Sequence, residues 1–132
     1  MRYSSGVQPK VLLAGGDFRA RALVLAQLQQ EGYDVTAVET WDEAELLLRK
    51  RAIRPDAVVF DVEGENHAEA ALATLAKLVA PARALILTSS SGVPVQDARR
   101  PGFDHVLARP YSVGDVVRTL AVLLEPQPGK RA

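Results

Sequence analysis

Short, wholly apolar runs recur along this chain, and most are followed by a stretch with helical spacing. The clearest runs are Val11–Ala14, Ala57–Phe60 and Ala84–Leu87. A run of four apolar residues without polar alternation is typical of a strand buried on both faces of a parallel sheet. Such strands, alternating with helices, predict an α/β fold with a doubly wound parallel sheet and right-handed crossovers.

The pattern predicts five strand–helix repeats in one domain that spans residues 9–125, with flexible termini at 1–8 and 126–132. The expected strands are Val11–Ala14, Tyr33–Val38, Ala57–Phe60, Ala84–Leu87 and His105–Ala108. The expected helices are Phe18–Glu31, Trp41–Arg51, Ala68–Ala80, Val93–Arg100 and a helix that begins after Ser112 and runs through Leu124.

Helix boundaries are marked by their own signals. Thr40 with Glu43, and Ser112 with Asp115, have the spacing of capping boxes. Gly32 is a typical helix terminator. Within the first helix, Leu23, Val24 and Leu28 are expected on one buried face.

Composition excludes several function classes. The 132 residues suit one domain, and 16 basic residues balance 16 acidic ones, so charge does not favour nucleic acid or anionic lipid as the main partner. The chain has no cysteine and only two histidines, which excludes thiolate zinc sites and histidine metal clusters. No apolar stretch is long enough to span a bilayer and no apolar signal core is present, so we expect a cytoplasmic protein without a membrane partner.

Polar residues follow the apolar runs where functional groups collect in open α/β sheets. Asp61 comes directly after the third run, and a strand-end aspartate is a natural nucleophile or metal ligand. Thr88 follows the fourth run and Arg109 the fifth. The carboxyl ends of parallel strands share one edge, so we expect these side chains to converge.

This layout resembles the receiver domain of two-component response regulators, from Val11 to Leu124. The resemblance depends on four motifs taken in order: Pro55-Asp56 with Asp61, Leu87-Thr88-Ser89, Gly102-Phe103-Asp104 and Arg109-Pro110-Tyr111. It implies a flavodoxin-like receiver fold, a three-layer αβα sandwich with strand order 2-1-3-4-5.

The resemblance also implies roles for single residues. Asp61 corresponds to the phosphoacceptor, Thr88 to the switch hydroxyl that binds the aspartyl phosphate, and Arg109 to the family's lysine. Pro110 corresponds to the proline that follows this lysine, usually in a cis peptide bond.

The chain also departs from the family pattern. The acidic pair that holds magnesium in the family falls on Gly15 and Gly16, which supply no ligand. Arginine at 109 keeps the charge but not the compact geometry of lysine. Valine at 106 replaces an aromatic residue that couples phosphorylation to the output face, and Val62–His67 replaces a Met-Pro-Gly segment. These departures indicate an atypical receiver, or pseudo-receiver.

Alternatives remain open for three acidic residues. Asp61 either accepts a phosphoryl group or is a retained carboxylate that caps nearby amides. Asp17 is an N-cap of the first helix or, with the first loop shifted by one residue, a magnesium ligand. Glu63 is a solvated loop residue or a further carboxylate near Asp61.

The function that we expect is signal transduction by protein–protein contact, without enzymatic activity and without a magnesium cofactor. The partner, a histidine kinase or a second copy, would bind the face formed by Val93–Arg100, His105–Ala108 and the last helix, with Tyr111 as an exposed anchor. The first alternative is a conventional receiver phosphorylated on Asp61, with Asp17 and Glu63 helping to hold magnesium. A less favoured alternative is a small flavodoxin-like enzyme or nucleotide binder, for which the chain lacks a general base and a cofactor fingerprint.

Overall fold

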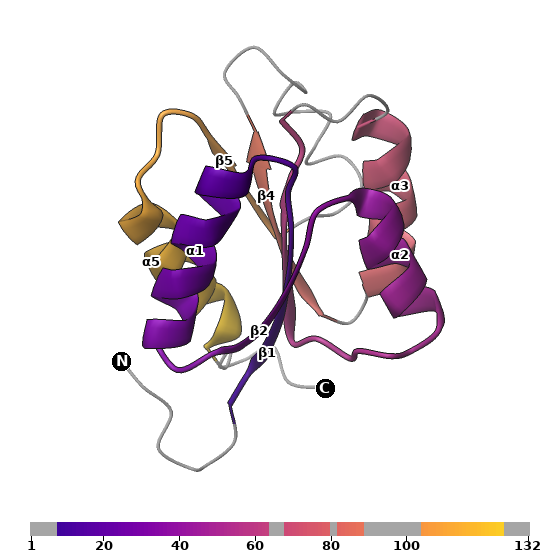
Figure 1. The fold of residues 1–132 in the computed structure, drawn as a ribbon, viewed down its shortest axis with the longest axis horizontal. Helices are drawn as coiled ribbons and strands as arrows, with labels where there is room; N and C mark the ends of the chain where they lie inside the picture. The colour runs from indigo at the N-terminus through magenta and orange to yellow at the C-terminus, as the bar shows by residue number, and fades with distance from the viewer. Residues whose placement is uncertain (1–7, 64–67, 80–81, 89–103, 126–132) are drawn as a thin grey trace.

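The computed structural model describes residues 8–63, 68–79, 82–88 and 104–125 (Figure 1). Its strands are β1 (Lys10–Ala14), β2 (Asp34–Val38), β3 (Ala57–Asp61), β4 (Arg83–Thr88) and β5 (His105–Ala108). Its helices are α1 (Phe18–Gln30), α2 (Trp41–Arg49), α3 (Ala68–Val79) and α5 (Val113–Leu124). The expected helix Val93–Arg100 lies outside the described residues, as do residues 1–7 and 126–132 of the termini.

The five strands form one parallel sheet in the order β2-β1-β3-β4-β5, which confirms the predicted topology. Helices α1 and α5 cover one face of the sheet, and α2 and α3 cover the other (Figure 1). Because all strands run in the same direction, their carboxyl ends meet at one edge. No helix in the described ranges is long and apolar enough to cross a membrane.

The sheet is apolar on both faces because successive side chains of a strand point to opposite sides. Leu12 belongs to the cluster under α2 and α3, whereas Leu13 belongs to the cluster under α1 and α5. The first cluster includes Trp41 and Phe60, whose ring centroids are 5.1 Å apart. Every residue of β3 is buried, so each large apolar side chain there contributes about 1.5–3 kcal/mol through burial.

Three predicted helix caps are present. Thr40 and Glu43 form a capping box at α2, and Ser112 and Asp115 form another at α5. At α1, the Ala20 N–H donates to Asp17 Oδ1 at 3.1 Å, so Asp17 is the N-cap. Each cap accepts hydrogen bonds from amides that have no partner inside the helix.

The carboxyl ends of α1 and α2 have the same geometry but different residues. At α1, Gly32 has a φ of 100°, its N–H donates to the Gln29 carbonyl, and the Tyr33 N–H donates to the Leu28 carbonyl. At α2, Arg51 has a φ of 55° and makes the corresponding hydrogen bond. Both ends are Schellman motifs. The prediction that the second helix continues through Arg51 was therefore wrong by two residues.

The buried face of α1 is narrower than the sequence predicts. Val24 and Leu28 are buried, whereas Leu23 is 61% exposed. Val24 and Leu28 are four residues apart and share a face of the helix. Leu23 precedes Val24 by one residue and therefore points to a different side of the helix.

Candidate functional site

Strand register brings the predicted site residues to one edge of the sheet. Asp61 is the last residue of β3, which lies between β1 and β4. Gly15 follows β1 beside it, and Thr88 ends the neighbouring β4. Asp61 and Thr88 are both buried, although each is polar. Thus, the predicted convergence of strand ends is present in the structure.

Both carboxylate oxygens of Asp61 accept hydrogen bonds. The Glu63 N–H donates to Oδ1 at 3.0 Å, which is the amide-capping geometry that the sequence offered as one alternative. The Arg109 guanidinium donates through Nη2 to Oδ2 at 2.9 Å and through Nη1 to Oδ1 at 3.4 Å. The buried carboxylate is therefore compensated by a cation from β5's end, 48 residues away in the chain.

Arg109 also holds a second carboxylate. Its Nη1 lies 2.8 Å from Glu63 Oε1, so one guanidinium bridges Asp61 and Glu63. The hydrogen bond to Asp61 raises the pKa of Arg109 above its ordinary value, so it stays charged. Glu63 is exposed, as expected of a loop residue, but it is ion-paired rather than only solvated.

Tyr111 covers the other side of this guanidinium. Its ring centroid lies 5.0 Å from Arg109 Cζ, in a cation–π contact. Burial, with a smaller contribution from the negative charge of Asp61, raises the pKa of Tyr111 to about 12. The side chain is partly buried and packs against the α1/α5 core, so the expectation of an exposed tyrosine was wrong.

The two glycines after β1 differ in the space around them. A Cβ added to Gly15 would lie 3.1 Å from Asp61 Cβ, whereas one added to Gly16 would meet only the Glu39 carbonyl at 3.9 Å. A side chain at Gly15 would thus crowd Asp61, and one at Gly16 would fit.

The residues around Asp61 do not fit a magnesium ion. Magnesium needs a nearly octahedral shell of oxygens, usually with one or two carboxylates. Asp17 is instead occupied as the N-cap of α1, and Glu63 is paired with Arg109. No group of three acidic or histidine side chains within the described ranges is arranged to hold a metal. The singly charged Arg109 guanidinium already pairs with both carboxylates, Asp61 and Glu63.

The remaining predicted residues lie near this centre. The Thr88 carbonyl accepts a hydrogen bond from the Arg109 N–H at 2.8 Å, which ties β4 to the residue that neutralises Asp61. The Arg109–Pro110 peptide bond is cis, as the resemblance implied. Val106 is buried in the core beneath α2 and α3, so it presents no side chain to the surface.

A cavity of about 180 Å³ lies beside Asp61, between α1 and the start of α5. Arg21 lines it together with Arg109, and its Nη1 donates to the Gly15 carbonyl. Sequence reasoning missed Arg21 because one arginine on a helix carries no distinguishing signal. The volume of this cavity is below the 300–1,000 Å³ typical of small-molecule pockets.

The structure is similar to solved receiver domains. The chain matches the signal receiver domain of a putative LuxO repressor protein from Vibrio parahaemolyticus with a TM-score of 0.75 and 21% identity, covering 89% of this chain and 91% of that one. The Francisella response regulator 1452 receiver domain gives 0.76 and 22%, covering 89% and 97%. The chemotaxis response regulator CheY4 of Vibrio cholerae gives 0.74 and 22%, covering 89% and 100%.

The chain therefore has the flavodoxin-like receiver fold of two-component response regulators. No protein-family model matches the sequence, and no curated protein matches it either. At these identities the similarity establishes the architecture, and the roles of individual residues have to be argued from their contacts.

Proposed function

We propose that this chain is a receiver-like signal-transduction module that acts through protein–protein contact, without magnesium-dependent phosphorylation and without enzymatic activity of its own. One observation carries the proposal: Arg109 occupies both Asp61 oxygens and Glu63 at once. In the receiver fold, the aspartate at this position attacks a phosphoryl group held by a metal. A carboxylate paired with a guanidinium is a poor nucleophile and a poor metal ligand.

The alternative is a conventional receiver in which a histidine kinase phosphorylates Asp61, with Thr88 as the switch hydroxyl and Asp17 and Glu63 as magnesium ligands. This alternative requires the Arg109 guanidinium to leave Asp61. It also requires Asp17 to give up its N-cap hydrogen bond, which costs about 1 kcal/mol. Both requirements favour the phosphorylation-independent function.

The deciding experiment treats the protein with acetyl phosphate and magnesium and measures its intact mass. Trp41 gives a second readout, because its ring packs on Phe60, next to Asp61. We expect neither an added phosphoryl mass nor a saturable fluorescence change on magnesium addition. A hydroxylamine-sensitive phosphoryl adduct that Asp61→Asn removes would establish the conventional receiver instead.

A rebuilt site supplies the positive control. Gly16→Asp adds a carboxylate where the backbone leaves room, and Arg109→Lys replaces the bidentate guanidinium by a single ammonium. We expect the double variant Gly16→Asp/Arg109→Lys to gain a saturable magnesium response that the natural chain lacks. This gain would show that the fluorescence readout detects binding.

The partner would bind the surface formed by β5 and α5. An exposed apolar side chain supports a contact on this surface, since Val122 on α5 is 58% exposed. A histidine kinase and a second copy of the chain are the two candidate partners. Sedimentation velocity of the natural chain and of Val122→Ser tests the second copy, since a dimer through α5 would dissociate in the variant.

A further inference from the structure

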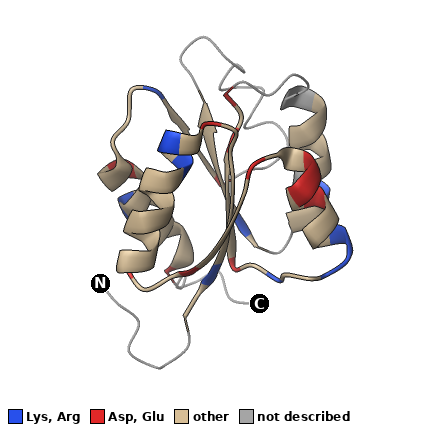
Figure 2. Ribbon diagram, in the orientation of Figure 1, with Lys and Arg blue, Asp and Glu red and all other residues tan. Residues whose placement is uncertain are grey.

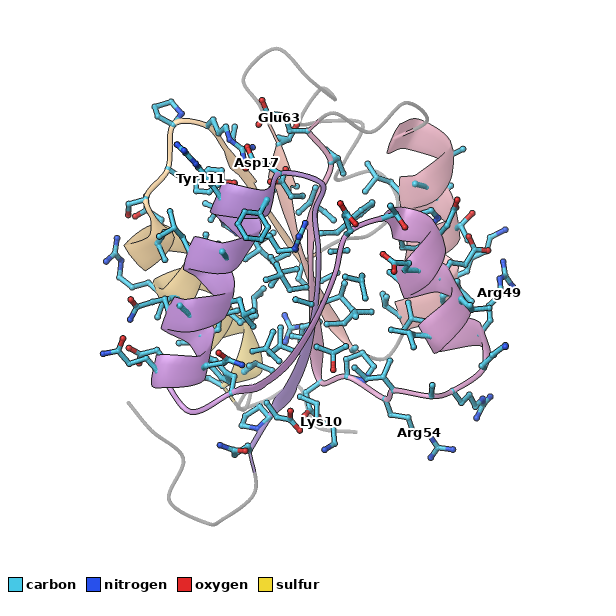
Figure 3. The ribbon with its side chains drawn as sticks, viewed as in Figure 1. Lys10, Asp17, Arg49, Arg54, Glu63 and Tyr111 are labelled. Carbon is cyan, nitrogen blue, oxygen red and sulfur yellow. The ribbon has the colours of Figure 1, made fainter. Side chains whose placement is uncertain are left out.

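Basic side chains gather at the amino edge of the sheet, opposite Asp61. Arg49 ends α2, Arg51 and Arg54 lie in the loop that follows, and Lys77 lies in the last turn of α3. All four line one open hollow of about 580 Å³, here called the basic hollow. Figure 2 shows blue at the lower end of α2 and along the loop below it, and Figure 3 labels Arg49 and Arg54 there.

Most of the basic side chains of the hollow have no acidic partner in the part of the chain that the structure describes. Among the described residues that line the hollow, none is acidic. Arg49 is paired with Glu45 at 2.7 Å, but the structure gives Arg51, Arg54 and Lys77 no ion pair with any described residue. The whole chain has a net charge of zero, so this imbalance is local. Like charges around a concave surface attract a counter-ion more strongly than scattered charges do.

Part of the lining of the basic hollow is apolar and is called its apolar floor below. Its lining includes Leu48, Ile53 and Leu78, which are partly exposed, and Val79, which is buried. The volume lies in the 300–1,000 Å³ range of small-molecule sites. A ligand that fits this lining therefore has an apolar body as well as a charged group.

The backbone at Arg51 provides an independent observation. Gly32 and Arg51 occupy the same position of two Schellman motifs, and both have positive φ. Glycine adopts this conformation without steric cost, whereas a residue with a Cβ is strained there. After α1 this position is occupied by glycine, Gly32, which is unstrained there. After α2 it is occupied by Arg51, whose side chain lines the basic hollow.

We propose that the basic hollow binds a small organic anion with two or more phosphate groups on an apolar body, of the nucleoside polyphosphate class. Guanidinium groups bind phosphate oxygens in pairs, and three arginines line the site. The basic side chains surround a hollow and do not form an extended row that could follow a nucleic-acid backbone. A nucleic-acid-binding surface with about 6–10 phosphate contacts would need such a row of basic residues.

Titration calorimetry of the whole chain with magnesium-free ATP tests the proposal, with inorganic pyrophosphate as the second ligand. We expect saturable ATP binding that is tighter than pyrophosphate binding, because the base and ribose contact the apolar floor. Arg51→Gly and Arg54→Gln should each weaken ATP binding about tenfold. Lys50→Gln and Arg19→Gln should leave it unchanged, because these exposed residues do not line the hollow.

Arg51→Gly also separates binding from folding. The substitution removes the positive-φ strain, so the variant should be at least as stable as the natural chain while it binds less ATP. Absence of saturable binding at about 1 mM ATP would overturn the proposal. So would equal affinity in the natural chain and both hollow variants, or equal affinity for pyrophosphate and ATP. Tighter binding to phosphatidylglycerol vesicles or to a single-stranded oligonucleotide would likewise overturn it.

Discussion

The two edges of the sheet differ in how their charged side chains are paired. At the carboxyl edge, Arg109 neutralises Asp61 and Glu63, and Tyr111 covers the guanidinium. At the amino edge, Arg51 and Arg54 line an open hollow in which none of the described lining residues is acidic. The described charges are paired at the first edge and partly unpaired at the second.

This contrast indicates that the fold alone does not determine which edge of the sheet binds a ligand. In open α/β sheets the carboxyl edge is the usual binding edge. Here the Asp61 carboxylate at that edge is already paired with the Arg109 guanidinium. At the opposite edge, the structure shows no ion pair for Arg51 or Arg54 with a described residue, and there we propose a ligand site. Four measurements can break or sharpen this comparison.

The largest effect is expected from Arg109→Ala. The substitution leaves the buried Asp61 carboxylate without its counter-charge, which should lower the free energy of unfolding by about 3 kcal/mol. Urea unfolding followed by Trp41 fluorescence measures the change. Arg19→Ala, on the exposed face of α1, is the control and should change stability by less than about 0.5 kcal/mol. Equal losses in the two variants would mean that the ion pair does not hold this edge together.

High pH should weaken the carboxyl edge through Tyr111. Its folded-state pKa of about 12 lies above the ordinary value of 10.0, so the neutral form is favoured in the folded state. The resulting stability is complete below pH 10 and is lost as pH rises toward 12. Allowing for solvent screening, the loss is about 1.5 kcal/mol. Tyr111→Phe should show a flatter stability curve over this range in urea unfolding, and parallel curves would refute the assignment.

At the amino edge, Arg51→Gly should raise the free energy of unfolding by about 1 kcal/mol, since glycine relieves the positive φ. The matched substitution is Gly32→Arg at the end of α1, which should lower stability by a similar amount. Urea unfolding of both variants gives the comparison. If Arg51→Gly were destabilising, the guanidinium would have a structural role that its contacts do not show.

The smallest effect is expected from Glu63→Gln. The pair between Glu63 and Arg109 is partly exposed, so its loss should cost about 0.5 kcal/mol. The cost should diminish at high salt, because exposed charges are screened. Unfolding at low and high sodium chloride tests both points. A loss as large as that of Arg109→Ala would show that Glu63, and not Asp61, is the main partner.

The sequence predicted the architecture because its signals were local. Apolar runs such as Ala57–Phe60 indicated strands, and the capping boxes at Thr40 and Ser112 indicated where helices begin. The errors were also local. Leu23 was placed on the buried face of α1, and α2 was extended to Arg51, because hydrophobic spacing does not locate a face or an end to within one residue.

The contacts within the site were harder to predict. Sequence reasoning brought Asp61 and Arg109 to the same edge, but their pairing joins residues 48 positions apart and depends on how far a guanidinium reaches. The partial burial of Tyr111 depends on contacts with Arg109 and with the α1/α5 core, which the sequence does not show. The basic hollow did have a signal in the chain: Arg49, Arg51 and Arg54 fall within six residues without an acidic residue among them.

The bridge between Arg109 and two carboxylates also limits how such a chain can evolve. An acid introduced first at Gly16 would add a third negative group beside charges that are already balanced. A shorter cation introduced first at position 109 would leave Asp61 poorly compensated. We therefore expect each single substitution to lower stability, so that a change at one of these two positions is coupled to a change at the other.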